Sequence, residues 1–358
     1  MNEMQSMLAD TAARLFEEQI TPEVLARAEA GDPLEDLWTL VQQQGFDLAL
    51  APEEAGGSGL DWCTVYPLVL LSGKFSLPLP LAETLLATWL LGKAGLPVPQ
   101  GRLTVARLGP ENVRTAAQGG QAQICGSVAD VPWAAAADHI VLCAELEGAA
   151  YAGVIAAPDT TIDTRLNIAR EPRCTVSFGE GVPLELVPLQ GVPAAALTYM
   201  GAMLRSAQMA GAAERLLQQS VQYADERVQF GRRLSAFQII QQHIAVIACE
   251  AAAMSAAASY AFSCADGDAP ELAIAAAKIR AGTGAGKVAS LAHAVHGAIG
   301  FTYEHTLHYS SRRLWAWRSE YGSHAWWSER LGRAAIAAGP QQWWPALTRG
   351  TLPLGSLQ

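Results

Sequence analysis

Three long helical patterns in the second half of the sequence constrain the fold more than any other feature. They read LTYMGAMLRSAQMAGAAERLLQQSVQYADERV, SAFQIIQQHIAVIACEAAAMSAAASYAFSCA and PELAIAAAKIRAGTGAGKVASLAHAVHG. Each pattern is rich in alanine and carries apolar residues on more than one face, so each helix needs several helical neighbours. We therefore predict that residues 194–358 form a four-helix bundle.

The middle of the chain has a different texture. Between residues 102 and 193, short runs with β-branched residues, such as DHIVLCAEL and YAGVIAAP, alternate with Gly, Pro and Asp. This pattern predicts a small antiparallel, β-barrel-like domain. Residues 1–101 show helical periodicity and predict an N-terminal helical domain. The expected fold is α+β and mainly α, and 358 residues suffice for three such domains.

Charge and composition exclude some classes of partner. The formal net charge is -10 and no dense Lys/Arg block occurs, so a nucleic acid is not expected as a partner. The N-terminal residues are acidic where a signal peptide has a basic region, which favours a cytoplasmic location. We also expect no membrane-spanning segment, because apolar runs such as LVLLSG are short.

The metal-binding residue types do not form a site in the sequence. The six cysteines lie far apart without a C-x-x-C pair, so we expect buried, reduced thiols. Two histidine pairs, His293 with His296 and His305 with His308, have a spacing that could ligate a metal. Regularly spaced cysteine or carboxylate ligands do not accompany these pairs, and we predict no metal centre.

One stretch, YADERVQFGRRLSAFQ, narrows the functional classes. It resembles the signature of the acyl-CoA dehydrogenase family, which has a tyrosine, an Arg-x-x-Phe-Gly and then a Phe-Gln. The matching residues are Tyr223, Arg227, Phe230, Gly231, Phe237 and Gln238. The segments APEEAGGSG and HGAIGFTYEHTLHYSSRRL are similar to further family segments, the second to one from a bacterial branch. The resemblance therefore extends over nearly the whole chain.

The resemblance implies a flavoenzyme. Family members use FAD to introduce an α,β double bond into an acyl-CoA thioester and pass electrons to a soluble electron-transfer flavoprotein. It implies a homodimer or tetramer, or a heteromer with a related subunit. Because the flavin carries the redox chemistry, no metal is needed. The residues expected to bind the cofactor are Arg227, Phe230, Gly231, Gln238 and Gly297.

Two arginines have implied roles. The family places the arginine matching Arg227 against the FAD of a neighbouring subunit, and a guanidinium suits a pyrophosphate dianion. The alternative is a surface ion pair with Asp225 or Glu226. Arg205 matches an arginine beside the thioester and CoA entrance, which predicts substrate binding. Its alternative is a role as an ordinary surface arginine.

A glutamate is expected to remove the α-proton of the substrate. Counted without gaps, the position of the family base falls on Tyr321, and Glu320 stands one residue before it. Glu320 lies among tryptophans, whose desolvating effect would raise its pKa toward the range of a general base. We predict that Glu320 is the base. The alternative is an ion pair with Arg318 or Arg330.

The tryptophans near Glu320 gather close together in the sequence. More often such residues belong to a core or a subunit contact, but their clustering suggests a wide apolar lining for a bulky or branched acyl chain. The four are Trp315, Trp317, Trp326 and Trp327.

The sequence also departs from the family pattern. An Ile-Thr-Asn that usually lies beside the flavin is Val131-Pro132-Trp133, which removes a hydroxyl. Ala294 and Ala298 replace a glutamine and a glycine around the Gly-Gly turn. A second hypothesis is therefore a non-catalytic subunit that lends Arg227 to a partner's FAD. A third is a flavin-dependent oxidase or desulfurising monooxygenase on the same fold.

Overall fold

The computed structural model describes residues 3–114, 122–179, 181–193, 195–267 and 269–354. Its helices are α1 (Glu3–Gln19), α2 (Pro22–Glu29), α3 (Glu35–Gln43), α4 (Trp62–Lys74), α5 (Leu81–Ala94), α6 (Ala196–Glu226), α7 (Gln238–Cys264), α8 (Glu271–His296), α9 (Leu307–Trp317) and α10 (His324–Arg349). Its strands are β1 (Leu103–Leu108), β2 (Val113–Arg114), β3 (Ala122–Ile124), β4 (Ser127–Pro132), β5 (His139–Leu146), β6 (Ala149–Ala156), β7 (Thr161–Leu166), β8 (Pro172–Ser177), β9 (Val182–Leu184), β10 (Val187–Pro188), β11 (Val228–Gln229) and β12 (Arg232–Arg233). The predicted order of a helical, a β and a second helical region is confirmed.

The chain divides into two compact units that do not follow this order. Unit 1 contains Met1–Leu25, Trp62–Leu77 and Thr198–Gln358, and unit 2 contains Ala26–Asp61 and Pro78–Leu197. Helices from the first hundred residues therefore belong to both units. The predicted domain boundaries at 101/102 and 193/194 remain a prediction. In the secondary structure, strands β1 to β10 lie between these positions.

The described residues of unit 2 form three small sheets. Their strand orders are β1-β5-β6-β10, β2-β3-β9 and β4-β8-β7. Apolar side chains that alternate along these strands form one core, which includes Ile140, Leu142 and Val176. A period of two places these residues on one face of each strand, so the sheets bury that face together.

Two features of the β region differ from the prediction. β1 pairs in parallel with β5, from Leu103 opposite His139 to Leu108 opposite Ala144, so the region is not wholly antiparallel. In the described residues the strands form separate sheets and not a closed barrel. Short β-branched runs reveal strands, but the partner of each strand depends on the crossover between them, which local sequence does not encode.

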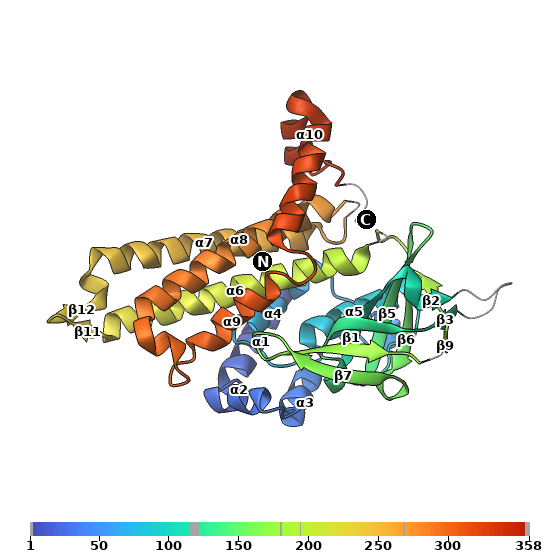
Figure 1. Cartoon of the computed structure of the whole chain (residues 1–358), viewed down its shortest axis with the longest axis horizontal. Helices are drawn as coiled ribbons and strands as arrows, with labels where there is room; N and C mark the ends of the chain where they lie inside the picture. The colour runs from blue at the N-terminus through green and yellow to red at the C-terminus, as the bar shows by residue number, and fades with distance from the viewer. Residues whose placement is uncertain (1–2, 115–121, 180, 194, 268, 355–358) are drawn as a thin grey trace. The chain divides into compact units, whose positions relative to one another are not determined.

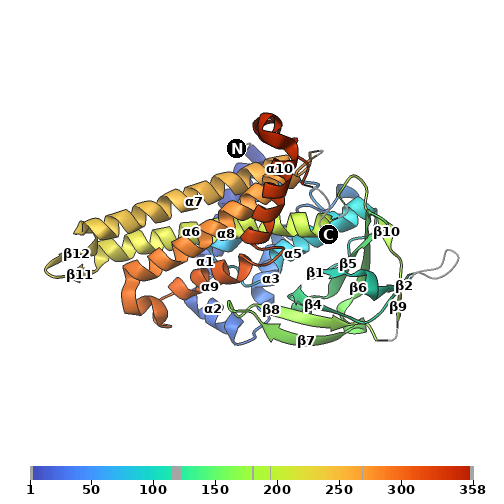
Figure 2. The ribbon, with the colours of Figure 1, turned by 45° about the horizontal axis from the view of Figure 1, so that its top comes forward.

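Unit 1 is built around the long helices. Figures 1 and 2 show α6, α7 and α8 running side by side. α9 and α10 pack on α8, and α4 packs on α7. The small residues of these helices allow close packing. A Cβ added at Gly73 of α4 would lie 2.0 Å from the carbonyl oxygen of Gln208 of α6, and one at Gly211 would lie 1.9 Å from that of Leu70.

α7 corrects the expectation that no segment is long and apolar enough to cross a membrane. Its mean hydropathy reaches 1.5 over a window of which 28% is buried. Glu250, on the inner side of α7, accepts hydrogen bonds from Arg280 and Lys287 of α8. Much of the apolar character of α7 comes from alanines, so the segment is apolar without a run of large side chains. They explain why the sequence pattern concealed it.

The cysteines only partly follow the prediction of buried thiols. All six are free; Cys125, Cys143 and Cys174 are buried in unit 2. Cys63 and Cys249 are exposed, which was not expected. A cysteine side chain is small and weakly polar, so a buried and an exposed cysteine look alike in the sequence pattern of a helix.

Candidate active site

Two of the predicted site residues meet in unit 1. The carboxylate of Glu320, in the segment between α9 and α10, accepts a hydrogen bond from Nε of Arg205 on α6 at 2.7 Å. The side chain of Arg205 is 2% exposed and that of Glu320 is 20% exposed. The sequence indicated each residue separately, but not their contact, because they are 115 residues apart.

Polar and aromatic neighbours orient the guanidinium of Arg205. Its Nη1 donates to Oε1 of Gln208, and Nε2 of Gln208 donates to the hydroxyl of Ser72 on α4 at 3.2 Å. The guanidinium also lies 5.6 Å from the ring centre of Trp317 and 5.8 Å from that of Tyr321. Arg205 is thus an interior residue held by two helices, and not the surface residue of the alternative interpretation.

The backbone after Glu320 has an uncommon conformation. Tyr321 has a φ of 52° and Gly322 a φ of 90°. Nε1 of Trp327 donates to the carbonyl oxygen of Tyr321 at 3.1 Å. The ring of Tyr321 lies against α6, where a Cβ added at Gly201 would come within 2.4 Å of it. A left-handed tyrosine persists only where its surroundings fix it, so this segment is firmly held.

The conformation explains how a residue one place before the family position can face the interior. The left-handed Tyr321 turns the chain so that Glu320 reaches Arg205 while the tyrosine ring packs on Gly201. The guanidinium favours the ionised form of the carboxylate, whereas aromatic surroundings alone would favour the neutral acid. The contact with Arg205 therefore acts against the effect that the tryptophans were expected to have on Glu320.

The predicted FAD-binding residues of the signature form an exposed hairpin. β11 and β12 pair with Val228 opposite Arg233 and Gln229 opposite Arg232. The two residues between them, Phe230 and Gly231, both have positive φ, of 54° and 77°. Two left-handed residues make the tight turn that suits a two-residue hairpin. Phe230 is 91% exposed, so the tip presents an apolar ring and nearby arginines to solvent.

Arg227 does not take part in the ion pairs considered for it. Asp225 accepts from Arg233 at 2.7 Å, and Glu226 accepts from Gln222 at 2.9 Å. The amide oxygen of Gln229, in the orientation that its neighbours favour, accepts from Arg227 at 2.7 and 3.1 Å. Among the described residues, the hydrogen-bond partner of Arg227 is therefore the neutral amide of Gln229. An exposed guanidinium with this partner fits an anionic pyrophosphate.

The two remaining predicted cofactor residues lie at helix ends. Gln238 is the exposed first residue of α7, and Gly297 follows the last residue of α8 with φ 63° and ψ -141°. The structure does not bring the hairpin and Glu320 together within one chain. Arg205 and Arg227 are both on or just after α6, and at 1.5 Å per residue the 22 residues between them span about 33 Å.

The β-domain position that replaces the family's Ile-Thr-Asn offers few donors to a flavin. Proline at position 132 has no N–H, and its carbonyl oxygen accepts from the hydroxyl of Thr104. The N–H of Trp133 donates to the carbonyl oxygen of Pro172 at 3.1 Å. These backbone groups are occupied within unit 2. This segment therefore does not fit a flavin that needs a backbone donor at positions 132 and 133.

The predicted tryptophan lining divides between two environments. Trp317 and Trp327 are core residues, 2% and 0% exposed. Trp315 and Trp326 instead stack with arginines, with the guanidinium of Arg318 4.9 Å from the first ring centre. The guanidinium of Arg330 is 3.9 Å from the second. Trp317 and Trp327 therefore fit the core interpretation, and the four rings do not form a single apolar lining.

The histidines form an aromatic cluster. His296 is 3% exposed and stacks on Tyr223 with ring centres 4.6 Å apart, and His305 lies 4.7 Å away on another side. Burial lowers the pKa of His296 to about 4, and burial also lowers the pKa values of His293 and His305. In the described part of the chain, no group of three or more His, Cys, Asp or Glu residues could hold a metal ion.

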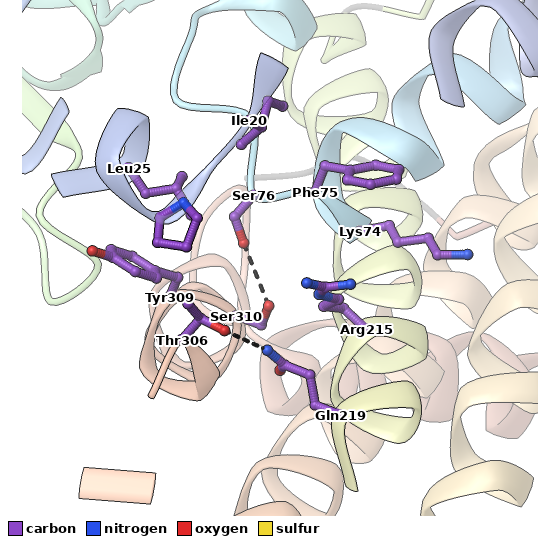
Figure 3. Close-up of a pocket in the computed structure, with 11 residues that line it drawn as sticks. Ile20, Leu25, Lys74, Phe75, Ser76, Arg215, Gln219, Thr306, Tyr309 and Ser310 are labelled. Atoms are coloured by element: carbon purple, nitrogen blue, oxygen red, sulfur yellow. Dashed lines mark hydrogen bonds between the residues drawn. The ribbon is translucent and has the colours of Figure 1, made fainter. Parts of the chain in front are cut away.

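A small cavity in unit 1 borders the histidine cluster, because two of its lining residues, Gln219 and Arg215, act on His296 and His305. Figure 3 shows Arg215 and Gln219 of α6 facing Ser76 and Ser310 across it. Its volume is about 50 Å³. A drug-sized ligand needs roughly 300 Å³ or more, whereas a water needs about 10–15 Å³. The cavity suits a few water molecules and is too small for an acyl-CoA.

Sequence reasoning missed three residues that shape the site. Gln208 orients Arg205, Tyr321 turns the chain, and Lys278 of α8 is fully buried nearby. Lys278 had a detectable signal, since it stands alone among alanines in ELAIAAAKIR at a position that an apolar residue would normally take.

The chain matches models of one family at both ends. Residues 2–95 match the acyl-CoA dehydrogenase N-terminal domain and residues 192–336 match the acyl-CoA dehydrogenase C-terminal domain. Acyl-CoA dehydrogenase IpdE2 from Mycobacterium tuberculosis is 30% identical over 323 residues, which cover 87% of this chain and 91% of the relative.

Solved structures share the fold. The ChsE4-ChsE5 complex from Mycobacterium tuberculosis superposes with a TM-score of 0.84 at 23% identity, covering 95% of this chain and 99% of that one. A variant of the steroid ACAD Tcur3481-Tcur3483 gives a TM-score of 0.83 at 24% identity, covering 94% and 99%. The family matches at both ends and the 30% identical relative determine the family of this chain. The chain, with its buried Arg205–Glu320 pair and its Phe-Gly hairpin, belongs to the acyl-CoA dehydrogenase family of enzymes.

Proposed function

We propose that the chain catalyses the FAD-dependent α,β-dehydrogenation of a bulky acyl-CoA thioester, with Glu320 as the base that removes the α-proton. The observation that carries the proposal is the Glu320–Arg205 pair, a carboxylate of unit 1 held at 2.7 Å by a buried guanidinium. A base must be ionised before it can accept a proton, and a guanidinium favours that state. The electrons then pass to a soluble electron-transfer flavoprotein.

The division of labour follows from the residues. Bound FAD supplies the acceptor for the hydride that leaves the β-carbon. Glu320 takes the α-proton on a carboxylate oxygen. Arg205, which Gln208 keeps in place, holds the carboxylate at one orientation. Because Arg205 is 2% exposed, its contribution to acyl-CoA binding acts through Glu320 and not through a contact at the surface.

The hairpin acts on the cofactor of a neighbouring subunit. About 33 Å of helix separates Arg227 from Arg205, so a hairpin that reaches solvent serves a site other than the one beside Glu320 of its own chain. Its exposed guanidinium and the Phe230 ring, 91% exposed, are placed to meet a partner. We propose that Arg227 binds the FAD pyrophosphate across a subunit interface.

The likeness to the steroid ACAD structure supports a bulky substrate and indicates which thioesters to test. Trp317 and Trp327, which were predicted to line a wide pocket, are core residues, so they do not support this part of the proposal. Steroid-derived acyl-CoA thioesters should therefore be compared with straight-chain ones.

The test replaces Glu320 with glutamine. Glu320→Gln keeps the size and hydrogen bonding of the side chain but removes its basicity, so flavin reduction by an acyl-CoA should slow by about 100-fold or more. Anaerobic mixing with a panel of thioesters, followed through the absorbance of oxidised flavin, measures the rate. Glu304→Gln changes an exposed glutamate and should leave the rate unchanged. Equal rates for Glu320→Gln and the wild type would remove Glu320 from the chemistry.

A second candidate function is that of one subunit in a heteromeric dehydrogenase. The observation that favours it is the Val131–Trp133 segment, where Pro132 has no N–H and the N–H of Trp133 already donates to Pro172. A related subunit with a hydroxyl at this position would then hold the flavin, and this chain would lend Arg227 to it. The ChsE4-ChsE5 complex shows that a protein of this fold forms a complex of two named subunits.

Flavin content distinguishes the two functions. If the chain is one subunit of a heteromer, the chain purified alone binds little FAD, and mixing it with a related subunit gives a complex with the yellow colour of bound FAD. On the homomeric reading, the chain alone is yellow and its flavin is bleached by an acyl-CoA. The visible spectrum after gel filtration, with and without the related subunit, separates these outcomes.

A further inference from the structure

Lys278 is a buried cation that the proposed chemistry does not use. It belongs to α8, its side chain is 0% exposed, and its Nζ donates to the carbonyl oxygen of Trp317 at 2.8 Å. Trp317 is the last residue of α9. The last carbonyls of a helix have no partner within the helix, and a cation there also interacts favourably with the helix dipole.

This contact lies three residues before Glu320. The short segment that follows α9 is therefore held from two helices: Lys278 of α8 binds the carbonyl oxygen at its start, and Arg205 of α6 binds the carboxylate. One turn further along α8, Gly282 allows the start of α10 to approach, because a Cβ there would lie 2.7 Å from Cβ of His324.

The charges around Lys278 come mainly from the same pair. Burial lowers the pKa of Lys278 to about 7; Glu320 acts in the opposite direction, and Arg205 lowers the pKa further. Glu250, an acid on the neighbouring helix α7, accepts hydrogen bonds from Arg280 and Lys287 of α8.

We propose that Lys278 is a positioning residue for Glu320, which fixes the end of α9 and adds a removable positive charge to the Arg205–Glu320 pair. With Lys278 protonated, the three groups carry a net charge of one positive unit. With Lys278 neutral, the ion pair is balanced and Glu320 loses a competing cation. The carboxylate is then a stronger base, so the rate of α-proton removal rises as Lys278 loses its proton.

The first experiment measures the proton on Lys278 without using catalysis. The unfolded chain keeps this proton up to about pH 10.4, but the folded chain releases it near neutrality. Unfolding between these values therefore takes up a proton, and stability rises with pH. The urea midpoint of the wild type should increase from pH 7 to pH 9 by more than that of Lys278→Met, in which no such proton exists.

Lys287→Met is the matched control, because Lys287 is an exposed lysine of the same helix. Its midpoint should change with pH as that of the wild type does. Equal pH dependence in Lys278→Met and the wild type would overturn the inference. If Lys278→Met does not fold, Glu320→Gln replaces it: loss of the acid should move the rise of the midpoint to lower pH, and an unmoved rise would overturn the inference.

The second experiment rests on the proposed function and uses the flavin-loaded assembly. The rate of flavin reduction should show an inflection near neutral pH in the wild type and in Lys287→Met, and none in Lys278→Met. An unchanged inflection in Lys278→Met would show that its charge does not reach Glu320. If no thioester reduces the flavin in any variant, the proposed function fails, while the urea experiment still tests whether folded Lys278 releases its proton near neutral pH.

Discussion

Arg227 is matched with a neutral amide, whereas its hairpin neighbour Arg233 is paired with Asp225. If Arg227 binds the FAD pyrophosphate, Arg227→Ala removes a charge-assisted contact of about 2 kcal/mol, so FAD affinity should fall by about 30-fold. Bound flavin per chain after gel filtration measures the loss. Arg233→Ala removes a hairpin arginine that already has an exposed acidic partner and should retain more flavin. Full retention in Arg227→Ala would contradict the assignment.

His296 gives unit 1 a defined sensitivity to acid. The pKa of this buried histidine is about 4 in the folded chain and about 6.5 in the unfolded chain. The unfolded state therefore binds the extra proton first as the pH falls, and stability is lost between about pH 6.5 and pH 4, by roughly 3 kcal/mol.

His296→Phe tests this loss, because it keeps a ring beside Tyr223 and removes the titrating nitrogen. Urea unfolding at pH 7.0 and pH 4.5 compares the two proteins. We expect the wild type to lose more stability over this interval than the variant does. His293 and His305 also have lowered pKa values, but they are present in both proteins, so the difference isolates His296. An equal loss would show that His296 is not the acid-sensitive group.

At the residue scale, the sequence identified the chemical groups of the site better than their contacts. Glu320 and Arg205 could be proposed from motif positions, but their ion pair depends on the left-handed Tyr321 and on the packing of its ring at Gly201. A backbone conformation of this kind is set by tertiary contacts. Lys278 was missed because a lysine in an alanine-rich helix more often reaches solvent. Its position among the alanines of ELAIAAAKIR was the one signal to the contrary, and the packing of α8 shows that it is buried.

At the scale of elements, the crossing of α4 and α6 supports the site. Gly73 lies against the backbone of Gln208, the residue that orients Arg205. Gly73→Ala would place a Cβ 2.0 Å from the carbonyl oxygen of Gln208, so the helices must separate. We expect a loss of about 3 kcal/mol in the free energy of unfolding, measured by urea denaturation.

Gly332→Ala is the matched control for this substitution. Gly332 lies within α10, and a Cβ there meets nothing within 4 Å. Alanine is the better helix former, so this variant should be as stable as the wild type or up to about 1 kcal/mol more stable. Equal stability of Gly73→Ala and Gly332→Ala would show that the close crossing carries no energetic weight.

The elements themselves were largely predictable and their pairing was not. The periodicity of the long segments located α6, α7 and α8, because each buries apolar residues at helical spacing. The β-branched runs located the strands of unit 2. The parallel pairing of β1 with β5 and the separate sheets depend on contacts between segments distant in sequence, which local patterns do not contain.

At the scale of the whole molecule, the outer face of α7 predicts an assembly. Ile239, Val246 and Tyr260 are 55%, 42% and 56% exposed, and with the exposed Ala253 they recur every seven residues. A seven-residue apolar repeat is the spacing at which one helix packs along another. We expect this face to contact a second copy or a related subunit.

Ala253→Arg tests this expectation by placing a charge in the middle of the repeat. The variant should have a lower molecular mass in light scattering than the wild type at the same concentration, because an unpaired buried charge disfavours association. Ala149→Arg, at an exposed position of β6, should leave the mass unchanged. An unchanged mass for Ala253→Arg would place the subunit contact elsewhere.

If Glu320 removes the α-proton of an acyl-CoA thioester, the enzyme should exchange that proton with solvent even when dehydrogenation is blocked. The assembled, flavin-loaded protein is incubated in D2O with a thioester that lacks hydrogen at the β-position, so that no hydride can leave. Proton NMR then follows the loss of the α-proton signal. We predict exchange by the wild type and by Glu304→Gln, and exchange about 100-fold slower or more by Glu320→Gln. Equal exchange by Glu320→Gln and the wild type would show that another group removes the α-proton.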